Sequence, residues 1–428
     1  MGRKAPARSD LPSALVERMR SRLGNGIEAW LKAMEAEPPV SIRYNPLKPI
    51  PEQGDRVPWC STGVHLSERP VFTLDPLFHA GAYYVQEASS MLVEQALRTT
   101  GLLGEDILAA DLCAAPGGKS TLVRSLLTPG SLLVSNEVDG RRRQVLEENL
   151  WKWGWPGVLI SGSPTRAFLD LPDRFDLVLV DAPCSGEGLM RRDHFAREQW
   201  SPELVQRCSA QQADILDHAW NTLAPGGALI YSTCTWEEAE NEDQVRRLKD
   251  LGAEELRPVL RGDHGILQGE HGLRCYPHTT KGEGFFLAVL RKPGVRRPMR
   301  QDRSDTAPMD LELRGTAYEI PAGWRSTVMA ADGALRLTAT SRPALQWDGS
   351  TPPHAGSAFL PPDHRPELPV LELDHATALS FLRGEALNMD AAKGIRLVTH
   401  EGFGLGWVRG AGRRWNNLYP KPWRIRMR

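Results

Sequence analysis

Two cysteine motifs in this chain follow strand-like apolar runs and could each supply a reactive thiol. One reads Asp181-Ala-Pro-Cys-Ser-Gly-Glu-Gly188 and the other reads Tyr231-Ser-Thr-Cys-Thr235. In a parallel sheet the loops after the strands meet at one edge, so we expect Cys184, Cys234 and Asp181 to lie close together. A single loop cysteine is more often inert than catalytic. A thiolate beside a proton-transferring carboxyl group, however, can perform covalent catalysis.

A glycine-rich segment, Asp111-Leu-Cys-Ala-Ala-Pro-Gly-Gly-Lys-Ser120, joins a predicted strand to a predicted helix. Glycines let a ligand approach the backbone closely, and the start of a helix offers free N–H groups. A phosphate-binding loop of the G-x-x-x-x-G-K-[ST] type requires glycine at the position of Cys113, so a nucleotide triphosphatase is disfavoured.

Glu137 stands 26 residues after Asp111, at the end of the next predicted strand. An acid at that place commonly accepts the ribose hydroxyls of a bound nucleoside. The alternative is an ordinary acid in the first turn of a helix, where negative side chains are also favourable.

Alternating strands and helices must position these motifs. Repeated βα units with continuous apolar strands predict an α/β fold, with a Rossmann-like parallel sheet covered by helices on both faces. The predicted strands are Ile107–Leu112, Leu132–Asn136, Val158–Ile160, Phe175–Val180, Ala228–Tyr231 and Phe285–Leu290. The predicted helices are Lys119–Leu127, Arg141–Leu150, Pro202–Leu223 and Glu237–Leu248.

Further regions flank this predicted sheet. Helical spacing in Leu11–Met34 indicates a small N-terminal α/β region. The basic, proline-bearing Arg291–Arg303 is predicted to be a linker, followed by short β-like runs. The end of the chain, with a helix at Ala376–Leu382, is predicted to form a small β-rich domain. We therefore divide the chain at residues 1–75, 76–292, 293–366 and 367–428.

Composition excludes other classes. The 428 residues are 41% hydrophobic and 25% charged, without an apolar run that could span a bilayer or an apolar signal-peptide core. A cytoplasmic protein without membrane contact is expected. The six cysteines form no CxxC pair, so no metal site is expected.

The C-terminal tail has an unusual charge distribution for a chain whose net charge is −1. Residues 407–428 contain seven basic residues and no acid, interleaved with Trp407, Trp415, Tyr419 and Trp423. Basic side chains follow phosphate backbones and aromatic faces stack on bases, which favours RNA contact. A solvated strand with core tryptophans is the alternative.

Together these motifs resemble the Sun-type RNA cytosine-5 methyltransferases, in particular their bacterial RsmF-like rRNA branch, over nearly the whole chain. The matching segments include Arg43-Tyr-Asn-Pro-Leu-Lys48, residues 80–91, the Cys113–Lys119 loop, Lys281-Gly-Glu-Gly-Phe-Phe286 and residues 415–425. The resemblance implies S-adenosylmethionine as cofactor and a PUA-like RNA-binding domain at the end of the chain. It also implies methylation of carbon 5 of a cytosine, with small-subunit rRNA as the favoured substrate and tRNA as the alternative.

By resemblance, Cys234 is the nucleophile, Cys184 helps to release the product, and Asp181 closes the cofactor and substrate pocket. Lys119 is expected to lower the pKa of the reacting thiol. The loop that wraps the methionine part of the cofactor consists of Cys113, Ala114, Ala115, Pro116, Gly117, Gly118 and Lys119, and Glu137 holds the ribose. The family usually has an aspartate against the adenine, but this chain has Ser163 or Pro164 there.

Two other readings remain. A DNA cytosine-5 methyltransferase would use the Pro-Cys thiol of Cys184, but the Thr-Cys-Thr motif and the tail argue against it. A non-catalytic RNA-binding assembly factor is disfavoured because the reactive residues are all present. The expected partner is therefore RNA, either naked or within a ribosomal subunit, and the expected state is a monomer.

Overall fold

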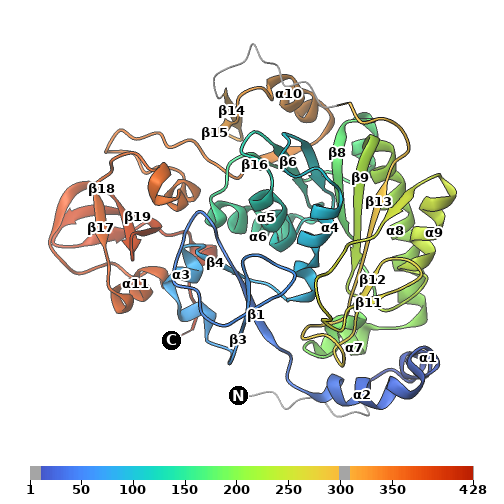
Figure 1. Cartoon of the computed structure of the whole chain (residues 1–428). Helices are drawn as coiled ribbons and strands as arrows, with labels where there is room; N and C mark the ends of the chain where they lie inside the picture. The colour runs from blue at the N-terminus through green and yellow to red at the C-terminus, as the bar shows by residue number, and fades with distance from the viewer. Residues whose placement is uncertain (1–10, 298–308, 428) are drawn as a thin grey trace.

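The computed structural model describes residues 11–297 and 309–427, and Figure 1 shows flanking regions packed around a central sheet. Residues 298–303 of the predicted linker and Arg428 of the tail lie outside the described residues. Within these ranges, no helix is long and apolar enough to cross a membrane.

The central sheet has ten strands in the order β11-β12-β13-β9-β8-β5-β6-β7-β16, and β10 pairs with β13. The five strands from β9 to β7 run parallel, which confirms the predicted α/β fold. The sheet is mixed, however, because β13, predicted as a further parallel strand, runs antiparallel to β9. Their apolar runs are buried because helices cover both faces. The strands are β5 (Leu108–Asp111), β6 (Leu132–Asn136), β7 (Val158–Ser161), β8 (Phe175–Asp181), β9 (Leu223–Thr233), β10 (Glu254–Leu256), β11 (Leu267–Gln268), β12 (Leu273–Cys275) and β13 (Phe285–Arg291).

Helices flank both faces of this sheet (Figure 1). One face carries α4 (Val93–Thr99), α5 (Gly118–Leu126) and α6 (Gly140–Trp153), and the other carries α8 (Pro202–Thr222) and α9 (Glu242–Asp250). Ser201 directly precedes α8 and caps it, because its hydroxyl accepts a hydrogen bond from the Leu204 N–H at 3.1 Å. Helix α9 begins at Glu242 rather than at Glu237, so the prediction of its start was wrong by five residues.

Residues 309–340 add to this core. Strands β14 (Met309–Leu313) and β15 (Thr316–Ile320) form a hairpin, and α10 (Arg325–Ala334) follows. Strand β16 (Leu337–Thr340) then joins the central sheet, antiparallel to β7. Part of the segment that follows the predicted linker is therefore the edge of the central sheet.

The N-terminal region has two helices and a sheet of its own. Helices α1 (Ser13–Leu23) and α2 (Ile27–Glu35) pack with Met190, Trp200 and Trp236 of the central region in one apolar cluster. The sheet has the order β2-β3-β1-β4, with β1 (Val40–Tyr44), β2 (Asp55–Arg56), β3 (Gly63–Leu66) and β4 (Tyr83–Val85).

The C-terminal region is a four-stranded sheet with one helix. Its order is β17-β18-β19-β20, from β17 (Val370–Glu372), β18 (Ala391–His400), β19 (Phe403–Gly412) and β20 (Trp415–Asn417), and α11 (His375–Leu382) packs on it. Trp407, Trp415 and Tyr419 are buried in this region, so the prediction that their faces stack on RNA bases was wrong.

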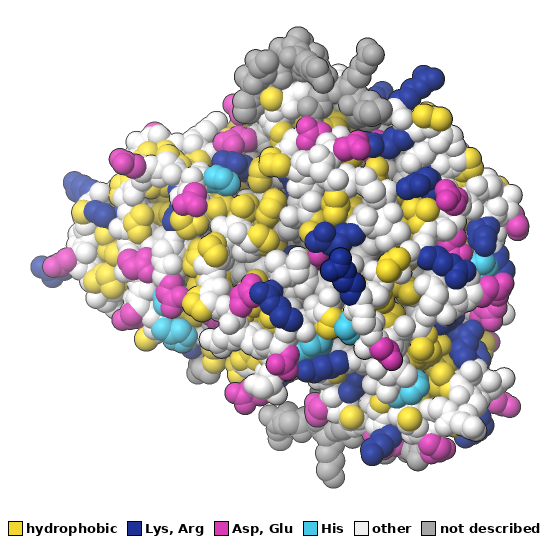
Figure 2. All heavy atoms as spheres, in the orientation of Figure 1, with side chains coloured by type: hydrophobic (Ala, Val, Ile, Leu, Met, Phe, Trp, Pro, Cys, Tyr) yellow, Lys and Arg dark blue, Asp and Glu magenta, His cyan; other side chains and the backbone are white. Residues whose placement is uncertain are grey.

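The basic residues of the tail lie at the surface, in contrast to the aromatic ones. Arg409, Arg413, Arg414, Lys421 and Arg426 are exposed. On the face shown in Figure 2, basic and acidic side chains are interspersed, in agreement with the net charge of −1. Any RNA contact of the tail must therefore use its charges or the half-buried Trp423 rather than its three buried rings.

Candidate active site

Two thiols meet at the carboxyl edge of the central sheet. Cys184 follows β8 and Cys234 follows β9, and their Sγ atoms are 3.2 Å apart. The Cys234 N–H also points to the Cys184 Sγ at 3.4 Å. The hydrogen bond with Cys234, together with burial, raises the pKa of Cys184 well above its usual value. Cys184 is therefore protonated at neutral pH and can donate its S–H to the other sulfur.

A half-buried ion pair lies at the same edge. The Lys119 Nζ is 2.7 Å from the Asp181 Oδ2, and the Ser232 hydroxyl donates to the other carboxylate oxygen at 2.8 Å. Burial alone would lower the pKa of Lys119, but Asp181 and, to a smaller extent, Cys234 raise it above its usual value. Lys119 therefore keeps its positive charge beside the carboxylate and the thiol.

The glycine-rich loop turns from β5 into α5. Gly117 has a left-handed conformation with φ of 111°, and a Cβ on Gly118 would lie 3.2 Å from the Tyr84 ring. The Ala114 N–H donates to the Asn136 carbonyl at 2.9 Å, which fastens the loop to the end of β6. The backbone thus needs small residues here and presents the first turn of a helix to a ligand.

The Asp111 side chain stabilises the glycine-rich loop through hydrogen bonds. Its carboxylate accepts hydrogen bonds from the Ser120 hydroxyl at 2.7 Å and from the Cys113 N–H at 3.4 Å. Burial raises the pKa of Asp111 to about 7. The Asp111 side chain therefore stabilises the loop through internal hydrogen bonds and is not available to bind a ligand.

Glu137 follows β6, the strand next to the glycine-rich loop. It is buried, accepts a hydrogen bond from the Asp139 N–H at 2.9 Å and lies 3.3 Å from an Arg142 nitrogen. A carboxylate fixed in this way beside an open glycine turn fits the ribose of a nucleoside-containing cofactor. The arrangement of residues 113–119 and Glu137 is therefore compatible with S-adenosylmethionine.

The Ser163 hydroxyl is hydrogen-bonded to other residues of the protein and is not available to a ligand. Ser163 is buried, and its hydroxyl accepts hydrogen bonds from the Arg336 N–H at 2.7 Å and from the Ser161 hydroxyl at 3.0 Å. The residue at the place of the missing aspartate thus secures the segment before β16. Asp173 does not replace that aspartate, because it precedes β8 at the opposite edge and pairs with Lys292 at 2.8 Å.

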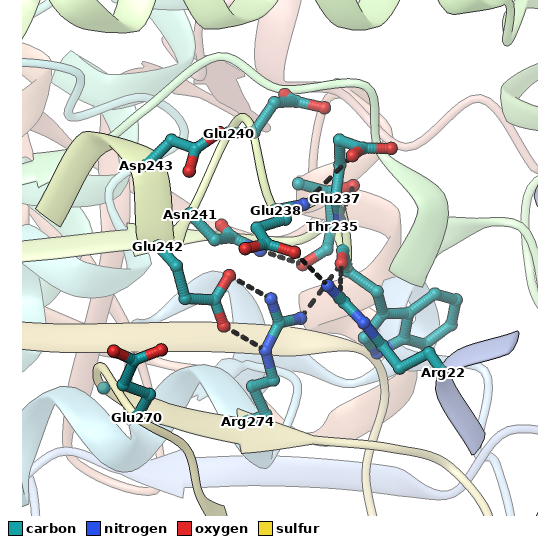
Figure 3. A network of polar contacts seen from close by, with 12 residues as sticks. Arg22, Thr235, Glu237, Glu238, Glu240, Asn241, Glu242, Asp243, Glu270 and Arg274 are labelled. Atoms are coloured by element: carbon teal, nitrogen blue, oxygen red, sulfur yellow. Dashed lines mark hydrogen bonds and ion pairs between the residues drawn. The ribbon is translucent and has the colours of Figure 1, made fainter. Parts of the chain in front are cut away.

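The segment between Cys234 and α9 was missed as a part of the site. The Glu240 carboxylate accepts hydrogen bonds from the Ser185 N–H at 2.9 Å and from the Gln212 amide at 2.8 Å. The Asn241 amide donates to the Thr235 carbonyl at 2.9 Å (Figure 3). These long-range contacts hold residues 237–241 as a loop and explain why α9 starts late. In the sequence, only the run of acidic residues in this segment indicated that it could be part of the site.

Figure 3 shows how arginines surround this loop. Arg22 of α1 and Arg274 of β12 both donate to the Trp236 carbonyl, the latter at 3.0 Å. Arg274 also pairs with the buried Glu242 at the start of α9. The residue two positions after Cys234 is therefore fixed from both the N-terminal region and the central sheet.

Comparisons with known proteins agree with this geometry along the chain. The model of the N-terminal domain of 16S rRNA methyltransferase RsmF matches residues 11–88. The model of 16S rRNA methyltransferase RsmB/F matches residues 103–291, and that of the methyltransferase RsmF PUA domain matches residues 368–425.

Individual relatives are similar over most of their length. Ribosomal RNA small subunit methyltransferase F of Aeromonas salmonicida is 30% identical, over 89% of this chain and 90% of the relative. The enzyme of that name from Cronobacter sakazakii is 32% identical, over 79% and 72%. A solved methyltransferase homolog from Pyrococcus horikoshii is 29% identical with a TM-score of 0.56, over 67% of this chain and all of that chain. The chain therefore belongs to the RsmB/F family of 16S rRNA methyltransferases.

Proposed function

We propose that this chain methylates carbon 5 of a cytosine in 16S rRNA, with S-adenosylmethionine as methyl donor, through a covalent bond between Cys234 and the base. The observation that carries the residue assignment is the 3.2 Å approach of the Cys234 and Cys184 sulfurs beside the Lys119–Asp181 pair. All four side chains lie at the carboxyl edge of one sheet. Asp181 ends β8, Lys119 is in the first turn of α5, and the two cysteines are on the loops after β8 and β9.

Carbon 5 of cytosine is a weak nucleophile, so the ring must first be activated. The Cys234 thiolate adds to carbon 6, and the ring becomes an enamine whose carbon 5 can take up a methyl group. Bound S-adenosylmethionine supplies that methyl group as an electrophile. N3 of the ring takes up a proton from solvent as the sulfur adds and returns it when the product forms. The Asp181 carboxyl group, anchored by Lys119 and Ser232, supports this change of charge.

Release of the product needs a base for the proton on carbon 5. Before the reaction, the hydrogen bond with Cys234 keeps Cys184 protonated. Once the Cys234 sulfur is bonded to carbon 6, that partner is a neutral thioether, so Cys184 loses its proton to solvent more easily. The Cys184 thiolate then takes the carbon 5 proton, the carbon–sulfur bond breaks, and Cys234 leaves as a thiolate.

The cofactor site is assigned to the glycine-rich loop and Glu137. We assign the methionine part to the loop of Cys113, Ala114, Ala115, Pro116, Gly117, Gly118 and Lys119, and the ribose to the buried Glu137 carboxylate. Asp181 borders both this loop and the substrate. The position of Ser163 supports adenine binding by backbone groups and apolar packing instead of by a carboxylate.

RNA binding is assigned to the regions on either side of the central sheet. We divide the chain at 1–75, 76–292, 293–366 and 367–428 and assign RNA affinity to the first and last parts. A target cytosine must leave its stack to reach the two thiols, so a loop or bulge of the RNA is the expected substrate. We further propose that the protein acts as a cytoplasmic monomer without a metal.

One experiment tests the activity directly. Purified protein is incubated with labelled S-adenosylmethionine and with naked 16S rRNA, assembled small subunits, tRNA or DNA from a strain that lacks the gene. Bisulfite sequencing then locates the modified cytosine. Methylation of one cytosine in 16S rRNA supports the proposal. Methylation of tRNA or DNA alone, or no methylation of naked 16S rRNA and of assembled subunits, would refute it.

A further inference from the structure

The buried carboxylate of Glu187 links the two cysteine loops to each other and to the N-terminal helix α1. Glu187 follows Cys184 by three residues and is fully buried. Its Oε2 accepts a hydrogen bond from the Trp236 N–H at 3.0 Å, two residues after Cys234. Its Oε1 accepts from Arg18 of α1 at 2.6 Å and from the Trp200 indole at 3.0 Å.

A second bond between the two loops lies directly beside this carboxylate. The Gly188 N–H donates to the Cys234 carbonyl at 2.8 Å. The two loops are therefore joined at two points on the C-terminal side of the thiols, three and four residues after Cys184. A shift of either loop would change the distance between the Sγ atoms.

The charge of Glu187 requires a counter-charge, because an isolated buried carboxylate is expensive. Arg18 supplies it, and its second nitrogen pairs with Glu237 of the loop that follows Cys234. Helix α1 is itself fixed, because Leu15 and Met19 are buried in the apolar cluster with Met190 and Trp236. One arginine of the N-terminal region thus neutralises a carboxylate next to both thiols.

We propose that Glu187 and Arg18 are positioning residues for the methyl transfer, which hold the Cys184 and Cys234 loops at the spacing that one cytosine ring requires. The inference rests on the proposed function, because Cys234 must reach carbon 6 and Cys184 must serve carbon 5 of the same base. The glycine-rich loop does not contact this pair through any hydrogen bond found in the described residues, so we expect cofactor binding to be independent of it.

The test compares Arg18→Ala, Arg18→Lys and the control Arg174→Ala, an exposed arginine before β8 at the opposite edge of the central sheet. A misplacement of about 1 Å can reduce a rate about 100-fold, so we expect kcat of Arg18→Ala to fall about 10- to 100-fold. Arg18→Lys should recover part of this loss, and Arg174→Ala should behave as wild type. The Kd for S-adenosylmethionine, measured by calorimetry, should stay within about two-fold in all three.

A double substitution tests the role of the charge. Glutamine at position 187 can still accept the Trp236 hydrogen bond but needs no counter-charge. Arg18→Ala/Glu187→Gln should therefore be more active than Arg18→Ala alone, which is a coupling that independent sites would not show.

The outcomes separate this inference from the proposed function. Failure of the wild-type protein to methylate its RNA would refute the proposed function. With an active wild type, unchanged kcat in Arg18→Ala would overturn the positioning role. A loss of rate that parallels a loss of cofactor affinity and thermal stability would also overturn it, since this is the pattern of general unfolding. If Arg18→Ala does not fold, the same comparison is made with Arg18→Lys and Glu187→Gln.

Discussion

The indole rings of Trp30 in α2 and Trp236 beside Cys234 pack edge to face, with ring centroids 5.5 Å apart and an interplanar angle of 80°. On its other side Trp236 stacks on Tyr276 at 5.9 Å. The residue two positions after the proposed nucleophile is thus held between the N-terminal helices and the central sheet, and the N-terminal region packs directly against the loop after β9.

This contact predicts the effect of truncating Trp30. The side chain is fully buried, so Trp30→Ala should lower the free energy of unfolding by about 3–5 kcal/mol and also reduce the rate of methyl transfer. Its indole N–H is buried without a hydrogen-bond partner among the described residues, so Trp30→Phe should cost clearly less. Urea denaturation measures both values. Equal losses for the two variants would contradict the packing argument.

The roles of the two cysteines can be separated by trapping. Cys234→Ala cannot bond to carbon 6, so both activity and covalent adduct should vanish. Cys184→Ala can still attack and transfer the methyl group but lacks the base for release, so protein bonded to RNA should accumulate as a slow band in a denaturing gel. The double variant should show no band. A nucleophilic Cys184, as in the DNA-type reading, predicts the opposite: an adduct in Cys234→Ala and none in Cys184→Ala.

Glu240 predicts a pH dependence of stability. Burial raises the pKa of this carboxyl from an ordinary 4.5 to about 7, so the folded chain keeps a proton there that the unfolded chain has lost. The protonated Glu240 contributes at most about 3 kcal/mol to the free energy of unfolding. This contribution is complete below about pH 4.5 and is lost as the pH rises to about 7.

Glu240→Gln imitates the protonated group and should remove this decline. Urea denaturation between pH 4.5 and 8 gives the difference between wild type and variant, which cancels the contribution of other titrating groups. We expect the variant to gain stability relative to wild type as the pH rises. A difference that is independent of pH would disprove the shifted pKa.

The tail predicts a loss of salt dependence in RNA binding. Arg413 and Arg414 are exposed between β19 and β20. If both contact phosphates of a single strand, Arg413→Ala/Arg414→Ala should reduce the slope of log affinity against log salt by about 1.4, at about 0.7 per contact. The exposed Arg174, before β8 at the opposite edge of the sheet, is a control. An unchanged slope in the double variant would show that the turn between β19 and β20 does not contact RNA phosphates.

Local sequence patterns were sufficient to predict the central architecture. Apolar runs and glycine turns repeat along the chain, so the strands from Leu108 to Val180 and the helix that begins after Ser201 could be located closely. The parallel order then requires Cys184 and Cys234 to emerge at one edge, because the loops after parallel strands share it. The side of the sheet that carries the chemistry follows from the order of the motifs alone.

The finer geometry of the site depends on contacts between distant segments, which no local pattern contains. Glu187 forms hydrogen bonds with Trp236, which is 49 residues away in the sequence, and with Arg18, which is 169 residues away. Helix propensity after Glu237 is overridden by hydrogen bonds of Glu240 and Asn241 to neighbouring loops. Such contacts exist only once the elements have packed, since a side chain finds its partner through the positions of whole helices and strands. The 3.2 Å between the sulfurs is therefore a result of tertiary packing.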